Sequence, residues 1–391
     1  MWHIHGEARD LSHLIHRHPG GGDVLLQMRG RDCTVLYETY HPQRPGRREG
    51  AWREATAVLR KHTGGASKMS DSALASAWLA GWALAYAWSL GHWLWDHEDT
   101  VAILSLGVSM WFFAADAVHS GSHRALFHSR ALNDWTVRCG FLFCPSFLWH
   151  RQHVLGHHIE INKPGVDPDI VHHPHAFFGW RVVPSTPWRR CYASWRASFV
   201  LSVLATQLAP SCVYAPWVLC TGRYPGVSER VPWAPRERLE AAAQTALWYG
   251  LVGYKVARAG WLAALAPFCI CGVIYYGFSQ VSHVNIPSMV PTPAAPTGFD
   301  RWVRTQVGEC PGDFALRSAW WTRVAIGLNT QAYHHLFPGV YHSHFPRMVD
   351  DLEGCLRRHG MARRVHADLA GSLRGHFRRL AELNDTATKV M

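Results

Sequence analysis

The run Ala73–Trp95 contains no Asp, Glu, Lys or Arg and is long enough to cross a bilayer as one helix. Three further apolar runs follow: Val101–Val118, interrupted only by Asp116, then Ala197–Thr221 and Gly260–Ser279. Several separate runs of this length are difficult to bury inside a soluble protein of 391 residues. We therefore expect an α-helical integral membrane protein with about four transmembrane helices and additional interfacial helices, rather than a soluble protein with buried helices.

The charges of the connecting loops predict how these segments are oriented. The turn Asp96–Thr100 is acidic, whereas the polar stretch after the second run carries many arginines. By the positive-inside rule this basic stretch is cytoplasmic. Ala197–Thr221 and Gly260–Ser279 then supply the two crossings that return the chain to the cytoplasm, while Ala241–Tyr254 lies in the interface or packs as a half-buried helix. The polar N-terminus predicts no signal peptide, so the first span directs insertion.

Changes in composition divide the chain into four parts. Residues 1–65 are polar and form a small N-terminal domain, residues 66–72 are a linker, and residues 73–348 form the membrane domain. Residues 349–391 alternate apolar and basic residues, which predicts amphipathic helices on the cytoplasmic face. The formal net charge of +11 is spread along the loops and tail, which fits a surface facing anionic lipid. No basic patch with interleaved aromatic residues is present in the sequence, so we expect no nucleic-acid partner.

The N-terminal domain contains two histidines in a spacing that suits haem. His18 opens the sequence His-Pro-Gly-Gly-Gly, and His41-Pro follows 23 residues later. Two neutral imidazoles on opposite sides of a flat cavity can take both axial positions of a haem iron, and such a site transfers electrons because no position remains for oxygen. The glycines let the backbone approach the ring closely. The alternative is a related fold that binds no haem.

This segment resembles cytochrome b5 in three features. The stretch Arg9–Ile15, the His-Pro-Gly-Gly turn and the second His-Pro all match, and the resemblance covers roughly residues 2–60. It implies a small α+β domain that binds haem b through His18 and His41. The chain departs from the family in beginning close to the motif and in having few acidic residues before His41.

Histidines also gather after the apolar runs. They form an H-x-x-x-H pattern, an H-x-x-x-H-H pattern, a Q-x-x-H-H pattern and one single histidine after the last span. On a helix, positions i and i+4 share a face, so their imidazoles can approach one metal ion. Ligating groups at membrane depth favour a functional role, and imidazole suits iron, copper or zinc. About eight histidines are too many for one ion, which predicts two metals. The residues are His119, His123, His153, His157, His158, Gln331, His334, His335 and His283.

These patterns resemble the three histidine boxes of the integral-membrane fatty acid desaturases. Gln331 opening the third box, together with the N-terminal domain, resembles the front-end branch of that family. The flanking residues agree, among them Trp149, Asn162 and Asp167–Asp169. The chain departs from the family pattern at Ser120 in the first box, and also in the H-x-x-x-H-H spacing and a proline-rich insertion near residue 290.

The resemblance implies a role for each box residue. All nine residues of the patterns above would bind metal, Gln331 directly or through water, and no other catalytic residue is implied. Asp116, His150 and Asp167 would support the ligands without binding metal, the two carboxylates by orienting histidine N–H groups. Five further histidines have no counterpart in the family pattern and are expected to be solvated or interfacial, and His128 has no assigned role. These five are His172, His173, His175, His342 and His344.

The resemblance also implies a reaction: oxygen-dependent removal of two hydrogens from a fatty acyl chain at two iron ions. The substrate would be a fatty acyl-CoA or an acyl-phospholipid, and electrons would come from an NADH–cytochrome b5 reductase-type donor through the haem. The implied location is the endoplasmic reticulum membrane, with the haem domain and a cap of histidine boxes on the cytoplasmic side. Two alternatives remain open: a hydroxylase or sphingolipid-modifying oxidase on the same scaffold, and a non-catalytic membrane haem protein. The sequence leaves regioselectivity and chain length open.

Overall fold

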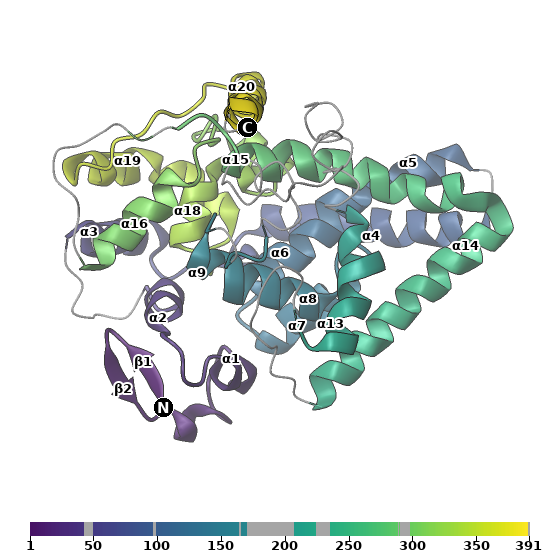
Figure 1. Cartoon of the computed structure of the whole chain (residues 1–391), viewed down its shortest axis with the longest axis horizontal. Coiled ribbons are helices and arrows are strands. Elements are labelled where there is room, and N and C mark those ends of the chain that lie inside the picture. Colours follow the sequence, from purple (N-terminus) through teal and green to yellow (C-terminus); the bar gives the residue numbers. More distant parts are fainter. Residues whose placement is uncertain are drawn as a thin grey trace.

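The computed structural model describes residues 1–42, 50–96, 99–163, 166–169, 207–223, 235–287, 289 and 298–389. Within these residues the chain is mostly helical, and its only sheet is a short antiparallel hairpin at the N-terminus. Strand β1 (Trp2–Ile4) pairs with β2 (Glu7–Arg9), with Trp2 opposite Arg9. In Figure 1 this hairpin lies at one corner, while the long apolar helices extend to the opposite side.

Among the described residues, three helices are long and apolar enough to cross a membrane. The first, α4 (Ala73–Trp95), has the bounds of the predicted run, and Ser72 caps it by accepting from the Ala75 N–H. The second is continuous over Thr100–Ser122. It consists of α5 (Thr100–Ser109), a π-helical turn (Met110–Ala115) and α6 (Asp116–Ser122). Its last turn carries the first histidine box, so a membrane helix delivers these side chains directly to the site.

The third long helix is bent back on itself. Helix α14 (Pro235–Tyr275) continues through a π-helical turn into α15 (Val281–His283). Gly260 lies inside α14 with φ 79° and ψ 172°, a backbone conformation that only glycine adopts readily. Figure 1 shows the two arms of α14 meeting at one end of the molecule.

One expectation about the later spans changes, and another falls partly outside the described residues. Ala241–Tyr254 is not a separate interfacial helix, because it lies within the first arm of α14 and joins Gly260–Ser279 through the bend. The residues between these runs favour helix, and a glycine alone supplies the reversal. Of the predicted span Ala197–Thr221, residues 197–206 lie outside the described part. The remainder holds a π-helical turn (Pro210–Tyr214) and α13 (Ala215–Thr221).

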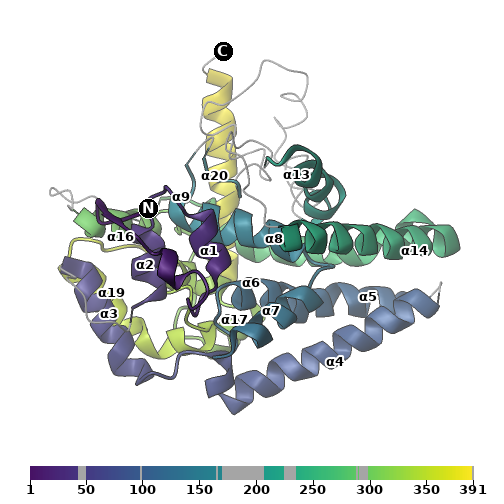
Figure 2. The same cartoon turned by 90° about the horizontal axis from the view of Figure 1, so that it is seen from below.

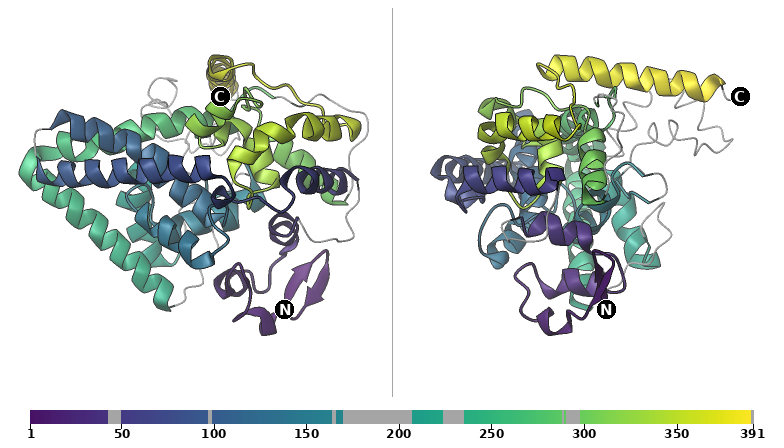
Figure 3. Two further views of the ribbon diagram at one scale, coloured as in Figure 1. Left: turned by 180° about the vertical axis from the view of Figure 1, so that it is seen from behind. Right: turned by 90° about the vertical axis from the view of Figure 1, so that its left-hand side faces the viewer.

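Helices near the two ends of the chain surround a second hydrophobic core. Trp52, in α3 (Gly50–Thr63), stacks on Phe337 with ring centres 5.3 Å apart, and the backbone N–H groups of Ala51 and Trp52 donate to Asp300 in α16 (Gly298–Gly308). Leu352 and Leu356 of α19 (Val349–Arg358) are buried in the same cluster. Helix α3 therefore packs with C-terminal elements, although the predicted N-terminal domain, residues 1–65, includes it. Helix α20 (Leu369–Lys389) lies across the top of the molecule (Figure 3).

The remaining helices are short and connect these layers. Figure 2 shows α7 and α8 between the N-terminal helices and the long arms of α14. Each short helix carries or supports one part of the site described below. They are α1 (Gly22–Gln27), α2 (Thr34–Tyr40), α7 (Arg130–Cys139), α8 (Ser146–Trp149), a π-helical segment (His150–His157), α9 (His158–Glu160), α17 (Ala319–Val324) and α18 (Gln331–Leu336).

The bend at Gly260 gives a test of the long-helix arrangement. A Cβ added at Gly260 would meet no atom within 4 Å, so a Gly260→Ala change acts only through the backbone. We expect it to destabilise the protein by about 1–3 kcal/mol, the cost of this conformation for an L-residue. Gly250, also in α14 and also in open space, is the matched control, and Gly250→Ala should be neutral or stabilise by up to ~1 kcal/mol. Thermal unfolding of the two detergent-solubilised variants measures both changes in stability. Equal changes for Gly260→Ala and Gly250→Ala would contradict a bend at Gly260.

Candidate metal centre

Seven of the predicted ligands converge in two groups, and every one of these side chains is buried except that of His283, which is half-buried. In each group the candidate ligand atoms all lie within 4.8 Å of one another. The members of each group come from sequence boxes far apart in the chain, which helices α6, α15 and α18 and the π-helical segment bring together. The first group is His119, His123, His153 and His334, and the second is His157, His283 and His335.

The two remaining predicted ligands connect these groups. His158 places its Nε2 3.2 Å from that of His153 and 3.1 Å from that of His334. Its ring also stacks on that of His335, with centres 4.3 Å apart. Gln331 places its amide nitrogen 3.1 Å from His283 Nε2 and 3.2 Å from His335 Nε2. All nine predicted residues therefore lie in one continuous site.

The local conformation of box two explains how one short segment serves both groups. Residues His150–His157 form a π-helical turn, which is wider than an α-helical one. In such a turn positions four and five residues ahead lie on nearly the same face. His157 and His158 therefore both point to the side of the helix that carries His153, and the segment can contribute to either group.

In the second group, hydrogen bonds fix the orientation of each imidazole ring. They are made by Nδ1, the nitrogen that faces away from the centre of the group. His157 Nδ1 donates to Asp167 at 2.9 Å, His335 Nδ1 donates to Gln306 Oε1 at 2.7 Å, and His283 Nδ1 lies 3.3 Å from the Glu309 carbonyl oxygen. A partner on Nδ1 leaves Nε2 to carry the lone pair toward the centre, which is the usual arrangement around a protein metal site. Asp167 is placed as the sequence predicts. Gln306 and the Glu309 carbonyl have no motif that marks them.

Ring nitrogens without partners indicate that the first group also fits a metal ion. Both ring nitrogens of His119 and Nε2 of His123 are buried and have no hydrogen-bond partner among the described residues. Leaving such polar atoms unpaired in the interior costs free energy, and a bound cation would satisfy one nitrogen of each of the two rings. Burial, reinforced by the neighbouring imidazoles, also holds the pKa of His158, His334 and His335 well below its usual value. These rings are therefore neutral, which is the form that binds a metal.

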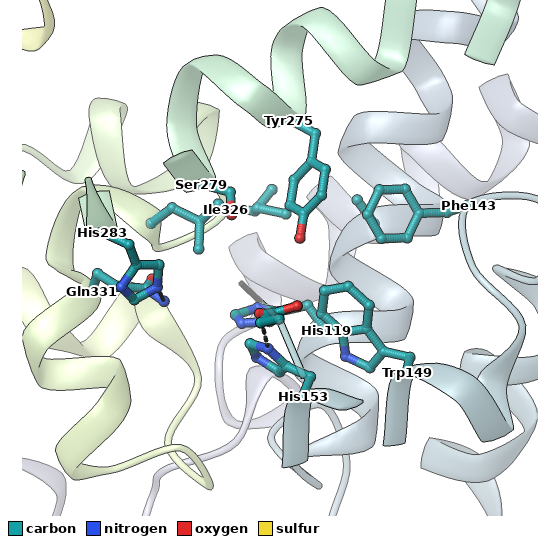
Figure 4. Close-up of a pocket in the computed structure, with 12 residues that line it drawn as sticks. His119, Phe143, Trp149, His153, Tyr275, Ser279, His283, Ile326 and Gln331 are labelled. Atoms are coloured by element: carbon teal, nitrogen blue, oxygen red, sulfur yellow. Dashed lines mark hydrogen bonds and ion pairs between the residues drawn. The ribbon is translucent and has the colours of Figure 1, made fainter. Parts of the chain in front are cut away.

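A pocket opens onto both groups. Tyr275 reaches into it from α14, opposite His119 and His153, while His283 and Gln331 line one end (Figure 4). Its other walls are mostly apolar and are formed by Ala115, Phe143, Trp149, Ile326 and Leu328. The arrangement places an apolar surface directly beside the candidate metal ligands.

Asp169 also lines this pocket and was not predicted as a site residue. Its Oδ2 lies 3.5 Å from His153 Nδ1 and 3.8 Å from His157 Nδ1. The sequence signal that could have identified it is its position in Asp-Pro-Asp, two residues after Asp167. In the structure the two residues are also linked, because the Asp169 N–H donates to the Asp167 carboxylate. It adds negative charge next to both groups.

Asp116 and His150, the two other residues predicted to support the ligands, make no hydrogen bond to either group among the described residues, and His128 had no predicted role. Asp116 accepts from Ser120 Oγ at 2.5 Å and from the Tyr341 hydroxyl at 2.8 Å, and not from a box histidine. His128 is exposed and lies 2.7 Å from Asp71.

The prediction that His342 and His344 are solvated or interfacial is wrong, since both are buried. The turn His342–Met348 folds back against α3 and α17, which covers its side chains. His342 lies 3.5 Å from Asp116. The histidines at 172, 173 and 175 lie outside the described residues.

The two N-terminal histidines have the geometry of a haem site. Their ring centres are 6.1 Å apart, and metal–nitrogen bonds of about 2 Å on each side of an iron would place two imidazole centres about 6 Å apart. His41 Nδ1 lies 2.8 Å from the Tyr37 carbonyl oxygen and His18 Nδ1 lies 3.2 Å from that of Gly21, so both can donate there. As in the metal centre, this directs each Nε2 toward the iron position.

In this chain, long apolar helices enclose a histidine-rich site, and a small domain with two facing histidines precedes them. These features define a membrane metalloprotein with a haem-type domain. Comparison with protein families gives the particular family. Residues 100–367 match the model described as fatty acid desaturase, and residues 1–49 match that of the cytochrome b5-like haem/steroid binding domain. The chain belongs to the fatty acid desaturase family, and it carries an N-terminal cytochrome b5 domain. Both predicted resemblances are thereby confirmed.

Several curated relatives align over nearly the whole chain. It is 24% identical to an acyl-lipid omega-13 desaturase of Chlamydomonas reinhardtii, over 100% of this chain and 94% of the relative. It is 26% identical to an acyl-lipid (8-3)-desaturase of Physcomitrium patens, over 99% and 88%. It is 21% identical to Delta(5) fatty acid desaturase A of Dictyostelium discoideum, over 98% and 90%. No solved structure gives a match. Membership in this family implies an oxidoreductase that uses iron, and the cytochrome b5 domain implies haem.

The outer hydrogen bond of His335 gives a test of the metal centre. We expect Gln306→Ala to weaken iron binding by about 10–100-fold, because the ring loses the partner that orients it. Gln244 is the control, since it is hydrogen-bonded to Ser146 instead. Iron content after dialysis against graded chelator concentrations measures both variants. Equal retention by Gln306→Ala and wild type would show that this contact supports no metal.

The haem ligands can be tested by absorbance. We expect His41→Ala to abolish the low-spin haem spectrum of the purified protein, because one axial ligand is lost. His16→Ala removes an exposed histidine close to His18 and should leave the spectrum intact. An unchanged spectrum for His41→Ala would refute its assignment.

Proposed function

We propose that this protein is a front-end acyl-lipid desaturase, which inserts a double bond between an existing one and the carboxyl group, with two iron ions held by the two histidine groups. The observation that carries the proposal is the convergence of eight histidines and Gln331 in a buried site, divided into two groups beside a mostly apolar pocket. One iron would be bound by the first group and the other by the second, with His158 between them. The front-end assignment rests on Gln331 in box three and on the fused cytochrome b5 domain.

The chemistry supplied by the bound iron is the oxygen-dependent removal of two hydrogens from an unactivated acyl chain, with reduction of O2 to water. The residues of this chain position and shield that reaction. Asp167, Gln306 and the Glu309 carbonyl hold the ring orientation of three ligands. Phe143 and Ile326, with the other apolar walls of the pocket, would fix the acyl chain beside the metals and exclude water.

The substrate is proposed to be a polyunsaturated fatty acyl chain, carried on a phospholipid or on coenzyme A. The relatives whose names specify an acyl-lipid favour an acyl chain carried on a lipid over one carried on coenzyme A. Their names give different double-bond positions, so no regioselectivity is assigned to this chain. Electrons would enter from an NADH–cytochrome b5 reductase-type donor through haem bound by His18 and His41.

We propose four membrane crossings: α4, the helix Thr100–Ser122 and the two arms of α14. The bend at Gly260 supports this count, because two arms return the chain to the side on which it entered. Box two before α14 and His283 after it then lie on one side, which a shared metal site requires. Under the positive-inside rule that side is cytoplasmic, and the endoplasmic reticulum is the proposed membrane.

The domain division is also part of the proposal. The membrane domain, residues 73–348, would carry every metal ligand, with residues 66–72 as the linker. The packing of Trp52 against Phe337 favours an end of the haem domain before α3 rather than at residue 65. The burial of Leu352 and Leu356 likewise joins the first part of the tail, residues 349–391, to the main body.

The activity is tested in a heterologous host supplied with a panel of polyunsaturated fatty acids. We expect a product with one additional double bond by mass spectrometry, and we expect His334→Ala or His157→Ala to abolish it because a ligand is lost. His128→Ala, an exposed histidine outside both groups, should retain it. A hydroxylated product would favour the hydroxylase alternative, and product from the His334→Ala variant would refute the metal assignment.

A further inference from the structure

The cytochrome b5 domain is packed against the helix that carries box two. The box-two segment consists of the π-helical segment and α9, residues His150–Glu160. Its residues Leu155 and Ile159 pack against the hydrophobic cluster of the haem domain, which includes Leu25 and Leu36. The two domains thus share one apolar core at this point. A haem domain held in this way has one fixed position relative to the metal centre.

Polar contacts at the edge of this interface fix its register. Arg130 donates to the Asp23 carboxylate at 2.9 Å. Gln27 donates to Glu237 at 3.0 Å, and Glu237 also accepts from Arg151 at 2.8 Å. These pairs connect α1 of the haem domain to α7, to the box-two segment and to the start of α14.

Tyr40 makes the contact that reaches the metal centre. Its hydroxyl lies 2.5 Å from Nδ1 of His123, and the two rings are stacked with centres 6.2 Å apart and planes 24° apart. Nε2 of His123 is the buried nitrogen without a partner among the described residues. If Nε2 binds metal, Nδ1 carries the proton and donates to the Tyr40 oxygen, as the other ligands do to their outer partners.

The neighbour of Tyr40 in the chain is the haem-ligand candidate His41. Its ring centre is 6.1 Å from that of His18. The path from one iron site to the other therefore consists of two adjacent residues, one hydrogen bond and His123. No other protein side chain has to be crossed along this route.

We propose that Tyr40 is the contact through which electrons leave the haem domain for the metal centre. This rests on the proposed function, and Tyr40 acts as a positioning residue that bridges two ligands. Through Tyr40 one electron passes at a time: ferrous haem becomes ferric, and one ferric ion of the metal centre becomes ferrous. Two transfers prepare the centre for oxygen, and a flavoprotein reductase restores ferrous haem. Tyr40 keeps its proton throughout and is neither oxidised nor reduced.

The test compares two variants of the full-length holoprotein. Tyr40→Phe removes only the hydroxyl that meets His123. Tyr37→Phe is the matched control, because Tyr37 lies in the same helix with its ring 5.1 Å from that of His41 and, among the described residues, makes no hydrogen bond to His123. Rapid-mixing absorbance follows the reoxidation of pre-reduced haem after addition of acyl substrate and oxygen. Haem spectrum, iron content and product from a single turnover after chemical reduction are measured alongside.

We expect Tyr40→Phe to slow haem reoxidation by about tenfold or more, with Tyr37→Phe within about twofold of wild type. The haem spectrum and the single-turnover product per bound iron should be retained, although iron binds more weakly once His123 loses its outer hydrogen bond, and rates are therefore compared per bound iron, which separates slow transfer from a damaged site. A wild-type reoxidation rate in Tyr40→Phe overturns the proposal, as does a loss of iron with an unchanged rate per bound iron. Absence of desaturated product from the wild-type protein would instead refute the proposed function.

Discussion

Seven buried imidazoles and the half-buried His283 lie in contact with one another and require a partner for nearly every ring nitrogen, and this requirement organises the molecule. A buried polar atom without a hydrogen bond costs free energy, so a cluster of this kind is unstable unless its nitrogens are satisfied. The second group satisfies its outer nitrogens through Asp167, Gln306 and the Glu309 carbonyl. Its inner nitrogens, and Nε2 of His123 in the first group, are left to bind a metal. The elements that surround the site supply either ligands or these outer partners.

Helix α18, which carries the third histidine box, shows how the surrounding fold holds metal-ligand side chains in place. Asp313 accepts from the backbone N–H groups of Gln331 and Ala332 at the start of α18, at 3.0 and 3.2 Å. Arg363 donates to the same carboxylate at 2.8 Å and also binds Glu353. A carboxylate at a helix N-terminus is favourable, and the guanidinium compensates its burial. The C-terminal segment therefore contributes directly to the position of His334 and His335.

The short N-terminal domain depends on the rest of the chain in a similar way. A domain of about fifty residues buries too little apolar surface to be robust alone. Here Leu155 and Ile159 of the box-two segment supplement its cluster. The same contact brings Tyr40 to His123. One apolar interface thus helps both to complete the haem domain and to set its distance from the metal centre.

Local patterns in the sequence were sufficient for the features that depend on residues close together in the chain. The limits of Ala73–Trp95 follow from the absence of charge, and the box histidines follow from their spacing. Tertiary structure alone revealed the partners Gln306 and Tyr40, the reversal at Gly260 and the burial of His342. Gln306 meets His335 across 29 positions and Tyr40 meets His123 across 83, so no local periodicity can mark them. The chemistry of the ligands was therefore readable from the sequence, whereas their orientation and the connection to the haem domain were decided by packing between distant elements.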